Sequence, residues 1–594
     1  MHKKQRGSKL TYIICLMSFL IVLAIGIYFL RGTDNQSKPL TLTEKDQKKL
    51  TEYVYSSVYD YLDGKKASHD DKTIAAVSGG KKDRLYLSIY YDNNLRGCQS
   101  IPISKKINTK QLNELVYKTM GDARFKNEIP KDQIDGVTLS FDFLSNRSEI
   151  SSRNIDELKD IITLGINPIQ ISNGEKSAYF IASVPITKNY QHKTLLEQLC
   201  KKAGLESICY QSDLTQIYKF DSFNFVSLGQ GKPPKVYYRF NPISQNIDED
   251  VLRNRLELVR DWFKTSYNSK KGIVEYEYYP SKNKYSDDVG SHTRELATIW
   301  AMTYLDEYLG NRKLKEAIDG SIQTYSKNII KKDNYAYFKM EDGSNNIAYS
   351  AFMVMSLLNT KEENQNDLIE PLINGILSRQ TVGGYFYTNF ESETIDGQDY
   401  YPGEALLALM HYYENTEDKK VIDVVMKAFP SYVGYWRGNK NTAFVPWHSK
   451  AYKILYEYTR DQKYAEFVFE MNDWLLNNHQ VESSPNSDLI GGFNKPNPTI
   501  STSVYLEGLA DAYSLAVKLN DANREKKYRD SIRLATNYLL KLQFTEENSF
   551  YLDAQSRALG GFKSSLTKNN LRIDNAQHAV FAISKIIDND IFNK

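Results

Sequence analysis

Residues 400–409 read Tyr-Tyr-Pro-Gly-Glu-Ala-Leu-Leu-Ala-Leu, a pattern typical of a helix that is apolar on most of its surface. Pro402 lies where the first helical turn tolerates proline, and Glu404 follows it in the same turn. Alanine and leucine fill the remaining positions, as expected for a helix surrounded by other helices. The stretch therefore predicts a buried helix with a carboxylate in its first turn.

Similar helices recur along the chain from about Asp248 onward. Apolar residues spaced three and four positions apart predict twelve helices, in which partly polar helices alternate with more uniformly apolar ones. The apolar helices begin near residues 292, 349, 401, 446, 501 and 574. Repeated helical pairs can bury their faces by packing side by side and closing into a ring. We therefore predict an all-α (α/α)6 toroid over residues 246–594.

Several motifs of this segment resemble the six-hairpin glycosidase superfamily, which includes the C-terminal domain of glucuronyl epimerases. The motifs are residues 400–409, Val445-Pro-Trp-His448, Leu571-Arg-Ile-Asp-Asn-Ala-Gln-His578, and the loops Gly383-Gly-Tyr385, Gly491-Gly-Phe493 and Gly560-Gly-Phe562. The resemblance implies a toroid with its long loops gathered on one rim. It does not imply one reaction, because such toroids host hydrolases, lyases, epimerases and inactive relatives.

The starts of the apolar helices bring reactive side chains to that rim. Glycoside hydrolysis requires two carboxyl groups, one protonated and one ionised, so the candidate catalytic residues are Glu404, Glu507 and Asp574. Aromatic, imidazole and guanidinium groups suit sugar rings and anionic groups. The candidate substrate-binding residues are Arg294, Tyr401, Trp447, His448, Tyr505 and His578, and the same helix starts also contain His292, Glu295, Tyr349 and Gln577.

Structural interpretations compete with these roles. Glu404 suits the positive end of a helix dipole, and Asp574 suits a helix cap. Three functions stay open. The first is a glycoside hydrolase that uses Glu404 and Glu507, with His448 and His578 positioning the substrate. The second is a uronate epimerase or lyase that relies on Tyr401, His448 and Arg294. The third is a non-catalytic scaffold that binds a glycan or a partner protein in an envelope complex for polysaccharide assembly or export.

Residues 44–228 have a mixed pattern, with two alternating strands at 85–91 and 137–143 and a helix at 194–203. Motifs in this segment resemble the AMMECR-one domain family, namely Asn94-Leu-Arg-Gly-Cys98, Asp122-Ala-Arg-Phe125, Leu195–Leu205 and Ile217–Phe220. The resemblance implies an α/β domain and no particular reaction. Residues 229–245 are expected to be a linker to the toroid.

Arg96 and Cys98 are a candidate secondary site, because a thiol beside a cation can have a lowered pKa and act as a nucleophile. Gln99-Ser100 follows where the family has an Ile-Gly-like pair, which is a departure at this site. The alternative is a tight turn with a buried cysteine. Cys200 and Cys209 either form a disulfide or are two buried thiols.

The N-terminus predicts a membrane anchor. Four basic residues within positions 1–9 precede an uncharged apolar run from Leu10 to Leu30, which as a helix would span about 30 Å, one hydrocarbon core. No small-residue cleavage site follows, so an uncleaved transmembrane helix is expected rather than a signal peptide. The charge bias places residues 1–9 in the cytoplasm and the bulk of the chain in the periplasm or outside the cell. Residues 31–43 are expected to be a linker.

The overall composition excludes several other classes of protein. Lys and Arg number 76 against 73 Asp and Glu, a net charge of +3 that is too balanced to predict nucleic-acid binding. Four cysteines are too few for a scaffold built on disulfides. No His-Glu-x-x-His motif occurs and no cysteine follows residue 245, so we expect no metal and no cofactor. The expected partners are a polysaccharide or oligosaccharide and the membrane around residues 10–30.

Overall fold

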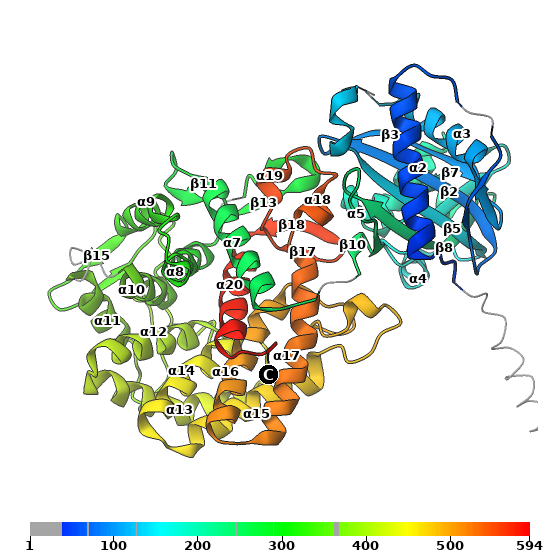
Figure 1. Cartoon of the computed structure of the whole chain (residues 1–594). Helices are drawn as coiled ribbons and strands as arrows, with labels where there is room; N and C mark the ends of the chain where they lie inside the picture. The colour runs from blue at the N-terminus through cyan, green and yellow to red at the C-terminus, as the bar shows by residue number, and fades with distance from the viewer. Residues whose placement is uncertain are drawn as a thin grey trace, which may run out of the picture.

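The computed structural model describes residues 39–593, except 68–69, 126–127, 244–245, 289 and 361–366. The expected cytoplasmic tail and transmembrane segment, residues 1–30, lie outside the described residues. Within the part of the chain that is described, no helix is long and apolar enough to cross a bilayer. The chain forms a sheet-rich N-terminal part and a helical C-terminal part (Figure 1).

The N-terminal part is built on a sheet with the strand order β10-β9-β8-β5-β2-β3. Its strands are β2 (Lys82–Tyr91), β3 (Asn94–Pro102), β5 (Thr138–Ile150), β8 (Gln216–Ser227), β9 (Lys235–Tyr238) and β10 (Asn241–Pro242). Apolar side chains that alternate along β2 and β5 pack together with residues of α2 (Glu44–Leu62) and α3 (Thr109–Met120) in one core. Figure 1 shows α2 lying across the sheet.

Part of the predicted linker at residues 229–245 forms two strands, in contrast to the sequence-based expectation. β9 pairs antiparallel with β8, with Tyr237 opposite Asn224, and β10 pairs with β9. The run Lys235-Val-Tyr-Tyr238 favours a strand because β-branched and aromatic side chains pack well on a sheet, and Tyr237 is buried. The sheet therefore continues to within a few residues of the first helix of the toroid.

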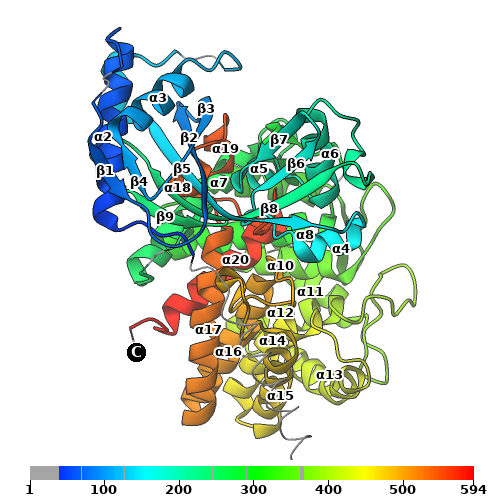
Figure 2. The same cartoon turned by 90° about the vertical axis from the view of Figure 1, so that its right-hand side faces the viewer.

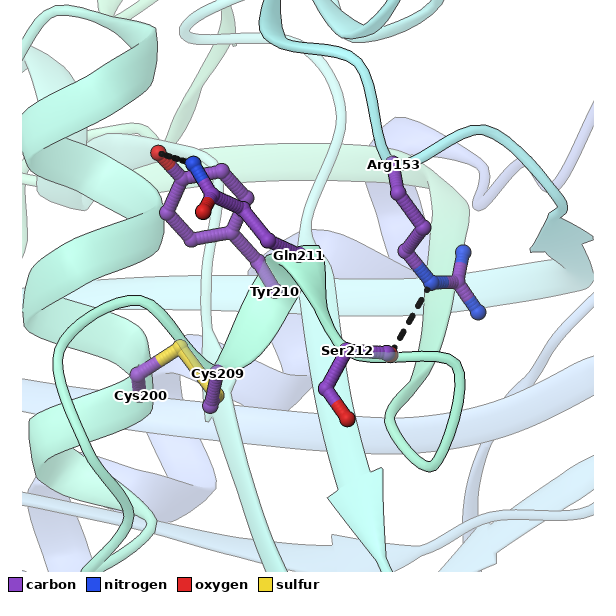
Figure 3. Close-up of a disulfide and its surroundings, with 6 residues drawn as sticks. All are labelled: Arg153, Cys200, Cys209, Tyr210, Gln211 and Ser212. Carbon is purple, nitrogen blue, oxygen red and sulfur yellow. Dashed lines mark hydrogen bonds between the residues drawn. A yellow bond between two sulfur atoms is a disulfide. The ribbon is translucent and has the colours of Figure 1, made fainter.

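A smaller lobe of the N-terminal part contains a disulfide. The lobe comprises α4 (Ile155–Ile161), β6 (Ile169–Asn173), β7 (Lys176–Phe180) and α6 (His192–Lys202). Cys200 of α6 is bonded to Cys209, which begins a short 3-10 turn (Figure 3). Tyr210 in that turn is buried, and Arg153 donates a hydrogen bond of 3.3 Å to the carbonyl of Ser212. Of the two alternatives for these cysteines, the structure has the disulfide.

The helical part is a closed double ring. Each inner helix contacts the next, and the last contacts the first, in the order α8 (His292–Leu309), α10 (Ile347–Thr360), α12 (Tyr401–Thr416), α14 (Phe444–Thr459), α16 (Ser501–Lys518) and α20 (Ile573–Asp588). The outer helices are α7 (Glu249–Ser266), α9 (Lys315–Ser326), α11 (Ile369–Leu377), α13 (Lys419–Gly438), α15 (Gln462–His479) and α17 (Ala522–Leu542). The described residues thus form an (α/α)6 toroid, as the helical pattern predicts.

At the recurring Gly-Gly loops, hydrogen bonds and close packing hold neighbouring outer helices together. Gln480, after α15, donates hydrogen bonds from Nε2 to the carbonyl of Gly491 (3.1 Å) and to that of Ser531 in α17 (3.0 Å). Gly491 has a φ of 90°, and a Cβ there would lie 2.2 Å from the carbonyl oxygen of Leu534. Glycine is therefore required by both conformation and space. The same arrangement recurs in the pairs Gln380–Gly384 and Gln543–Gly560.

The N-terminal part and the toroid share a buried interface. Arg239, between β9 and β10, forms an ion pair with Asp488 of the toroid, with 2.6 Å between Nε and Oδ2, and both side chains are almost fully buried. Phe550 of the toroid packs in one apolar cluster with Tyr237 and Phe240 of the N-terminal part. Figure 2 shows the N-terminal part lying over the toroid.

Gly403 allows α12 to pack closely against α14 at the rim. A Cβ at this position would lie 2.7 Å from ring atoms of His448 and 2.8 Å from Cβ of Trp447. His448 is fully buried and Trp447 nearly so, so neither can move aside without disturbing its neighbours. The close approach of the two helices depends on the missing side chain.

We predict that Gly403→Ala lowers the free energy of unfolding by about 1–3 kcal/mol, the usual cost of overpacking a filled site. Gly434→Ala in α13 is the matched control, because a Cβ there meets no atom within 4 Å. Alanine is the better helix former, so this control should leave stability unchanged or raise it by up to about 1 kcal/mol. Denaturant unfolding measures both, and equal stability of the two variants would contradict the tight contact.

Candidate active site

The first turns of the inner helices enclose a cavity of about 390 Å³ at one rim of the toroid. Six of the nine toroid residues predicted to form the site lie in its wall. They are Arg294 of α8, Tyr401 and Glu404 of α12, Trp447 of α14, and Asp574 and His578 of α20. The repeat of helical hairpins therefore brings together residues that are up to 284 positions apart in the chain, from Arg294 to His578.

Glu404 is a buried carboxyl group in this wall. It is only 4% exposed, and its Oε2 atom has no hydrogen-bond partner. Because burial disfavours the charged form, the pKa of Glu404 is raised to about 8. Its position in the first turn of α12 favours the anion through the helix dipole, but the effect of burial is larger. Glu404 is therefore protonated at neutral pH.

Asp574 is held by two arginines. Arg572 donates from Nε to Oδ1 (2.8 Å) and from Nη2 to Oδ2 (2.7 Å), and Nε of Arg294 lies 3.1 Å from Oδ2. Burial alone would raise the pKa of Asp574, but the hydrogen bonds and charge of Arg572, with the charge of Arg294, lower it below its usual range. Asp574 is therefore ionised, and it lies within α20 rather than capping it.

One cavity thus contains a protonated and an ionised carboxyl group, with pKa values displaced in opposite directions. Divergent pKa values mark acid and base assignments in enzymes. Glycoside hydrolysis needs such a pair, since the acid protonates the leaving oxygen and the carboxylate activates water or attacks the sugar. Burial therefore makes Glu404 a possible proton donor, and the charge of Arg572 makes Asp574 a carboxylate that stays ionised in the same cavity.

Glu507 is not part of the cavity wall. It lies behind His578, with 2.6 Å between Oε1 of Glu507 and Nδ1 of His578, and only 4% of Glu507 is exposed. A carboxylate on one ring nitrogen fixes the orientation of an imidazole and leaves the other nitrogen available for a ligand. This arrangement gives Glu507 a positioning role toward His578.

His448 and Tyr505 also lie outside the cavity wall. The ring of His448 stacks on Phe444 with centroids 3.4 Å apart, and burial lowers the pKa of His448 to about 3. Tyr505 donates a hydrogen bond of 2.8 Å from its hydroxyl to Oγ1 of Thr442. Both side chains face neighbouring packed residues instead of the cavity, although Trp447, next to His448, does line it.

Two further residues belong to the site. Arg572 fixes Asp574, and its signal in the sequence is its position two residues before that aspartate. Gln577 lines the cavity, and its buried Nε2 has no hydrogen-bond partner. An unpaired buried donor beside a cavity is available to a polar ligand. Within the described residues, no group of three or more His, Cys, Asp or Glu side chains is arranged to bind a metal ion.

The candidate secondary site does not have the expected electrostatics. Cys98 accepts a hydrogen bond from Oγ of Ser88 at 3.3 Å, and burial raises the pKa of its thiol instead of lowering it. Arg96 donates to the carbonyl of Tyr91 at 3.3 Å. A different cation, Arg124, donates a hydrogen bond of 2.7 Å from Nη2 to the carbonyl oxygen of Cys98. The expectation of a thiol activated by Arg96 is therefore wrong.

Comparison with known proteins gives matches for both parts of the chain. Residues 51–225 match the AMMECR1 family model. In that part, a protein of Nanoarchaeum equitans is 29% identical over 131 residues, which are 22% of this chain and 72% of that protein. Residues 378–559, within the toroid, match the model of Glycosyl Hydrolase Family 88.

Solved structures that resemble the protein include two carbohydrate-active enzymes. A family 76 α-mannanase of Bacteroides thetaiotaomicron is 10% identical, with a TM-score of 0.40, over 59% of this chain and 98% of that one. Cellobiose 2-epimerase from Bacillus thermoamylovorans is 12% identical, with a TM-score of 0.44, over 57% of this chain and 98% of that one.

The chain therefore joins an N-terminal part, residues 39–243, to a toroid. We call the N-terminal part the AMMECR1 domain because its residues 51–225 match that family model. Residues 378–559 of the toroid match the Glycosyl Hydrolase Family 88 model, which supports a carbohydrate-active enzyme.

Proposed function

We propose that the toroid hydrolyses glycosidic bonds of a polysaccharide, with Glu404 as the general acid and Asp574 as the catalytic carboxylate. The observation that supports this most strongly is the opposite displacement of the two pKa values in one cavity. Arg294, Tyr401, Trp447 and His578 surround the pair and supply charge, aromatic area and hydrogen bonds for the sugar. The family match at residues 378–559 supports the same class of reaction.

The chemistry proceeds through proton transfers that the two carboxyl groups can perform. Glu404 gives its proton to the glycosidic oxygen as the bond to the anomeric carbon breaks. Asp574, ionised and held by Arg572, stabilises the developing positive charge on the sugar and either activates a water or bonds to the anomeric carbon. Water supplies the hydroxyl group of the new reducing end, and its remaining proton restores the acid.

We predict that Glu404→Gln and Asp574→Asn each lower kcat by at least about 100-fold, because each removes one half of the acid and base pair. The assay incubates the protein with neutral, uronate-containing and amino-sugar polysaccharides and follows new reducing ends together with absorbance near 232 nm. The matched control is Glu417→Gln, an exposed carboxylate at the other end of α12. Glu507→Gln should have a smaller effect, since an amide oxygen can still accept a hydrogen bond from His578.

The same assay separates the other candidate reactions. Absorbance near 232 nm would indicate the unsaturated uronate of a lyase, and exchange of a sugar proton with solvent without new reducing ends would indicate an epimerase. Binding without any turnover would indicate a scaffold. Full activity of Glu404→Gln would contradict the proposed acid.

The pH dependence of hydrolysis gives a second prediction. The reaction requires protonated Glu404, so kcat/KM should fall as the pH rises through about 8, the pKa of that group. Asp574, with a lowered pKa, should stay ionised well below pH 5, so the acid limb lies at low pH. A pH profile of kcat/KM measures both limbs. An alkaline limb below about pH 6 would contradict the raised pKa of Glu404.

We further propose that the protein acts outside the cytoplasm, anchored by residues 10–30. The apolar run with basic residues before it supports this orientation. The disulfide between Cys200 and Cys209 also supports it, because disulfides persist in oxidising compartments.

Thiol labelling in intact bacterial cells that express the full chain tests this location. A membrane-impermeant maleimide should leave Cys200 and Cys209 unmodified until a reductant is added, and external protease should digest the bulk of the chain. A cytoplasmic protein of the same cells is the control for membrane integrity, because it should resist the external protease. Cys200 and Cys209 found as free thiols, or a chain fully protected from protease in spheroplasts, would contradict export.

A further inference from the structure

A second cavity, of about 650 Å³, lies between the AMMECR1 domain and the toroid. One wall is formed by residues 159–164 and 191–192 of the AMMECR1 domain, and the other by residues 497–500 and 564–568 of the toroid. We refer to it as the interdomain cleft. It exceeds the catalytic cavity of about 390 Å³ and lies within the range of ligand sites, about 300–1,000 Å³.

The interdomain cleft adjoins the catalytic cavity at the starts of two inner helices. On α16, Ile500 faces the cleft and Val504, one turn later, faces the cavity. Arg572, just before α20, lines the cleft, while Asp574 in the first turn of α20 lines the cavity, and the two side chains are hydrogen-bonded to each other. Arg572, which fixes Asp574, is therefore part of the cleft wall.

The chemistry of the cleft wall suits a chain of sugars. Amide and hydroxyl side chains form much of it, and these groups hydrogen-bond sugar hydroxyls in both directions. Five charged residues also line it, namely Lys159, Asp160, Arg239, Lys568 and Arg572. Apolar surface from Leu489 and Pro498 suits the faces of the rings. The side chains of Asn497 and Lys568 are exposed and bond to no other described residue, so they are available to a ligand. The amide and hydroxyl residues include Gln191, Asn486, Thr499, Ser565, Thr567 and Asn575.

Contacts between the domains hold the two walls at a fixed separation. The β17 (Lys563–Ser565) and β18 (Lys568–Arg572) hairpin lies beside β10 and α5 (Ser183–Thr187) in Figure 1. Oδ1 of Asn189 accepts the backbone N–H of Asn569 at 3.1 Å, and Nε2 of Gln191 donates to the carbonyl of Thr567 at 2.9 Å. The buried ion pair of Arg239 and Asp488 fixes the remaining side. A preformed cleft loses less conformational entropy when a ligand binds.

We propose that the interdomain cleft binds the part of the polysaccharide that extends beyond the bond at Glu404 and Asp574. The AMMECR1 domain then serves as one wall of an extended glycan-binding site. The inference rests on the proposed glycan chemistry of the toroid, and it adds a subsite formed by both domains. It assigns Asn497 and Lys568 to substrate binding without a role in bond cleavage.

The test compares glycans of increasing length with the full chain in detergent. Binding of oligosaccharides of two to ten sugars from each polysaccharide class is measured with the Glu404→Gln protein, which does not consume them, and turnover is measured with the wild type. The double substitution Asn497→Ala and Lys568→Ala should weaken binding of the longer glycans by about fivefold or more, the loss of two hydrogen bonds. It should leave disaccharide binding unchanged. Lys419→Ala, an exposed lysine at the start of α13, is the matched control.

The outcomes distinguish the cleft from the catalytic proposal. Affinity that rises with glycan length and falls in the double variant supports the cleft, whether or not the wild type hydrolyses the glycan. If glycans bind in this way but the wild type does not hydrolyse them, the proposed cleft is supported and the proposed hydrolysis is rejected. Affinity independent of glycan length, equal loss for disaccharides and long glycans, or no binding of any glycan would overturn the inference.

Discussion

Closure of the inner ring between α20 and α8 is the constraint on which the rest of the structure depends. Closure forces the first turns of all inner helices onto one rim, so side chains scattered from Arg294 to His578 line one cavity. Because both carboxyl groups in its wall are largely buried, the local environment sets the charge of each. Glu404 has no partner and stays neutral, whereas Asp574 has two arginines and stays ionised. The starts of the inner helices and Arg572, at the end of β18, thus give the two carboxyl groups different charges.

The AMMECR1 domain connects directly to this rim. β9 and β10 extend its sheet toward the toroid. Arg239, between these two strands, forms the buried ion pair with Asp488 that joins the two domains. A buried ion pair adds little stability by itself, but its partners tolerate no loss of either charge, which favours one relative placement of the domains. The AMMECR1 domain contacts Asn569 of the β17–β18 hairpin. Arg572, three residues later in the chain, is hydrogen-bonded to Asp574. Domain placement and the position of Asp574 are therefore structurally linked.

The sequence predicts the helical repeat well because apolar spacing and Gly-Gly loops are local signals. It predicts Arg294, Tyr401, Glu404, Trp447, Asp574 and His578 as neighbours because each begins an inner helix. It cannot distinguish Trp447 from His448, since only packing against Gly403 and Phe444 decides which of two adjacent side chains faces the cavity. It also cannot assign Glu507, whose contact with His578 joins residues 71 positions apart. The sequence predicts a linker where the structure has a strand at 235–238, because Gly229–Pro234 before it has the composition of a loop.

The central claim, a neutral Glu404 beside an ionised Asp574, is tested most directly by NMR titration of the protein with 13C-labelled glutamate and aspartate carboxyl groups. The account predicts one glutamate resonance that titrates near pH 8 and is missing from Glu404→Gln, and one aspartate resonance, missing from Asp574→Asn, that titrates below the usual range of aspartate. If every glutamate titrates below about pH 5, near the ordinary value of an exposed carboxyl group, the assignment of Glu404 as the acid is contradicted.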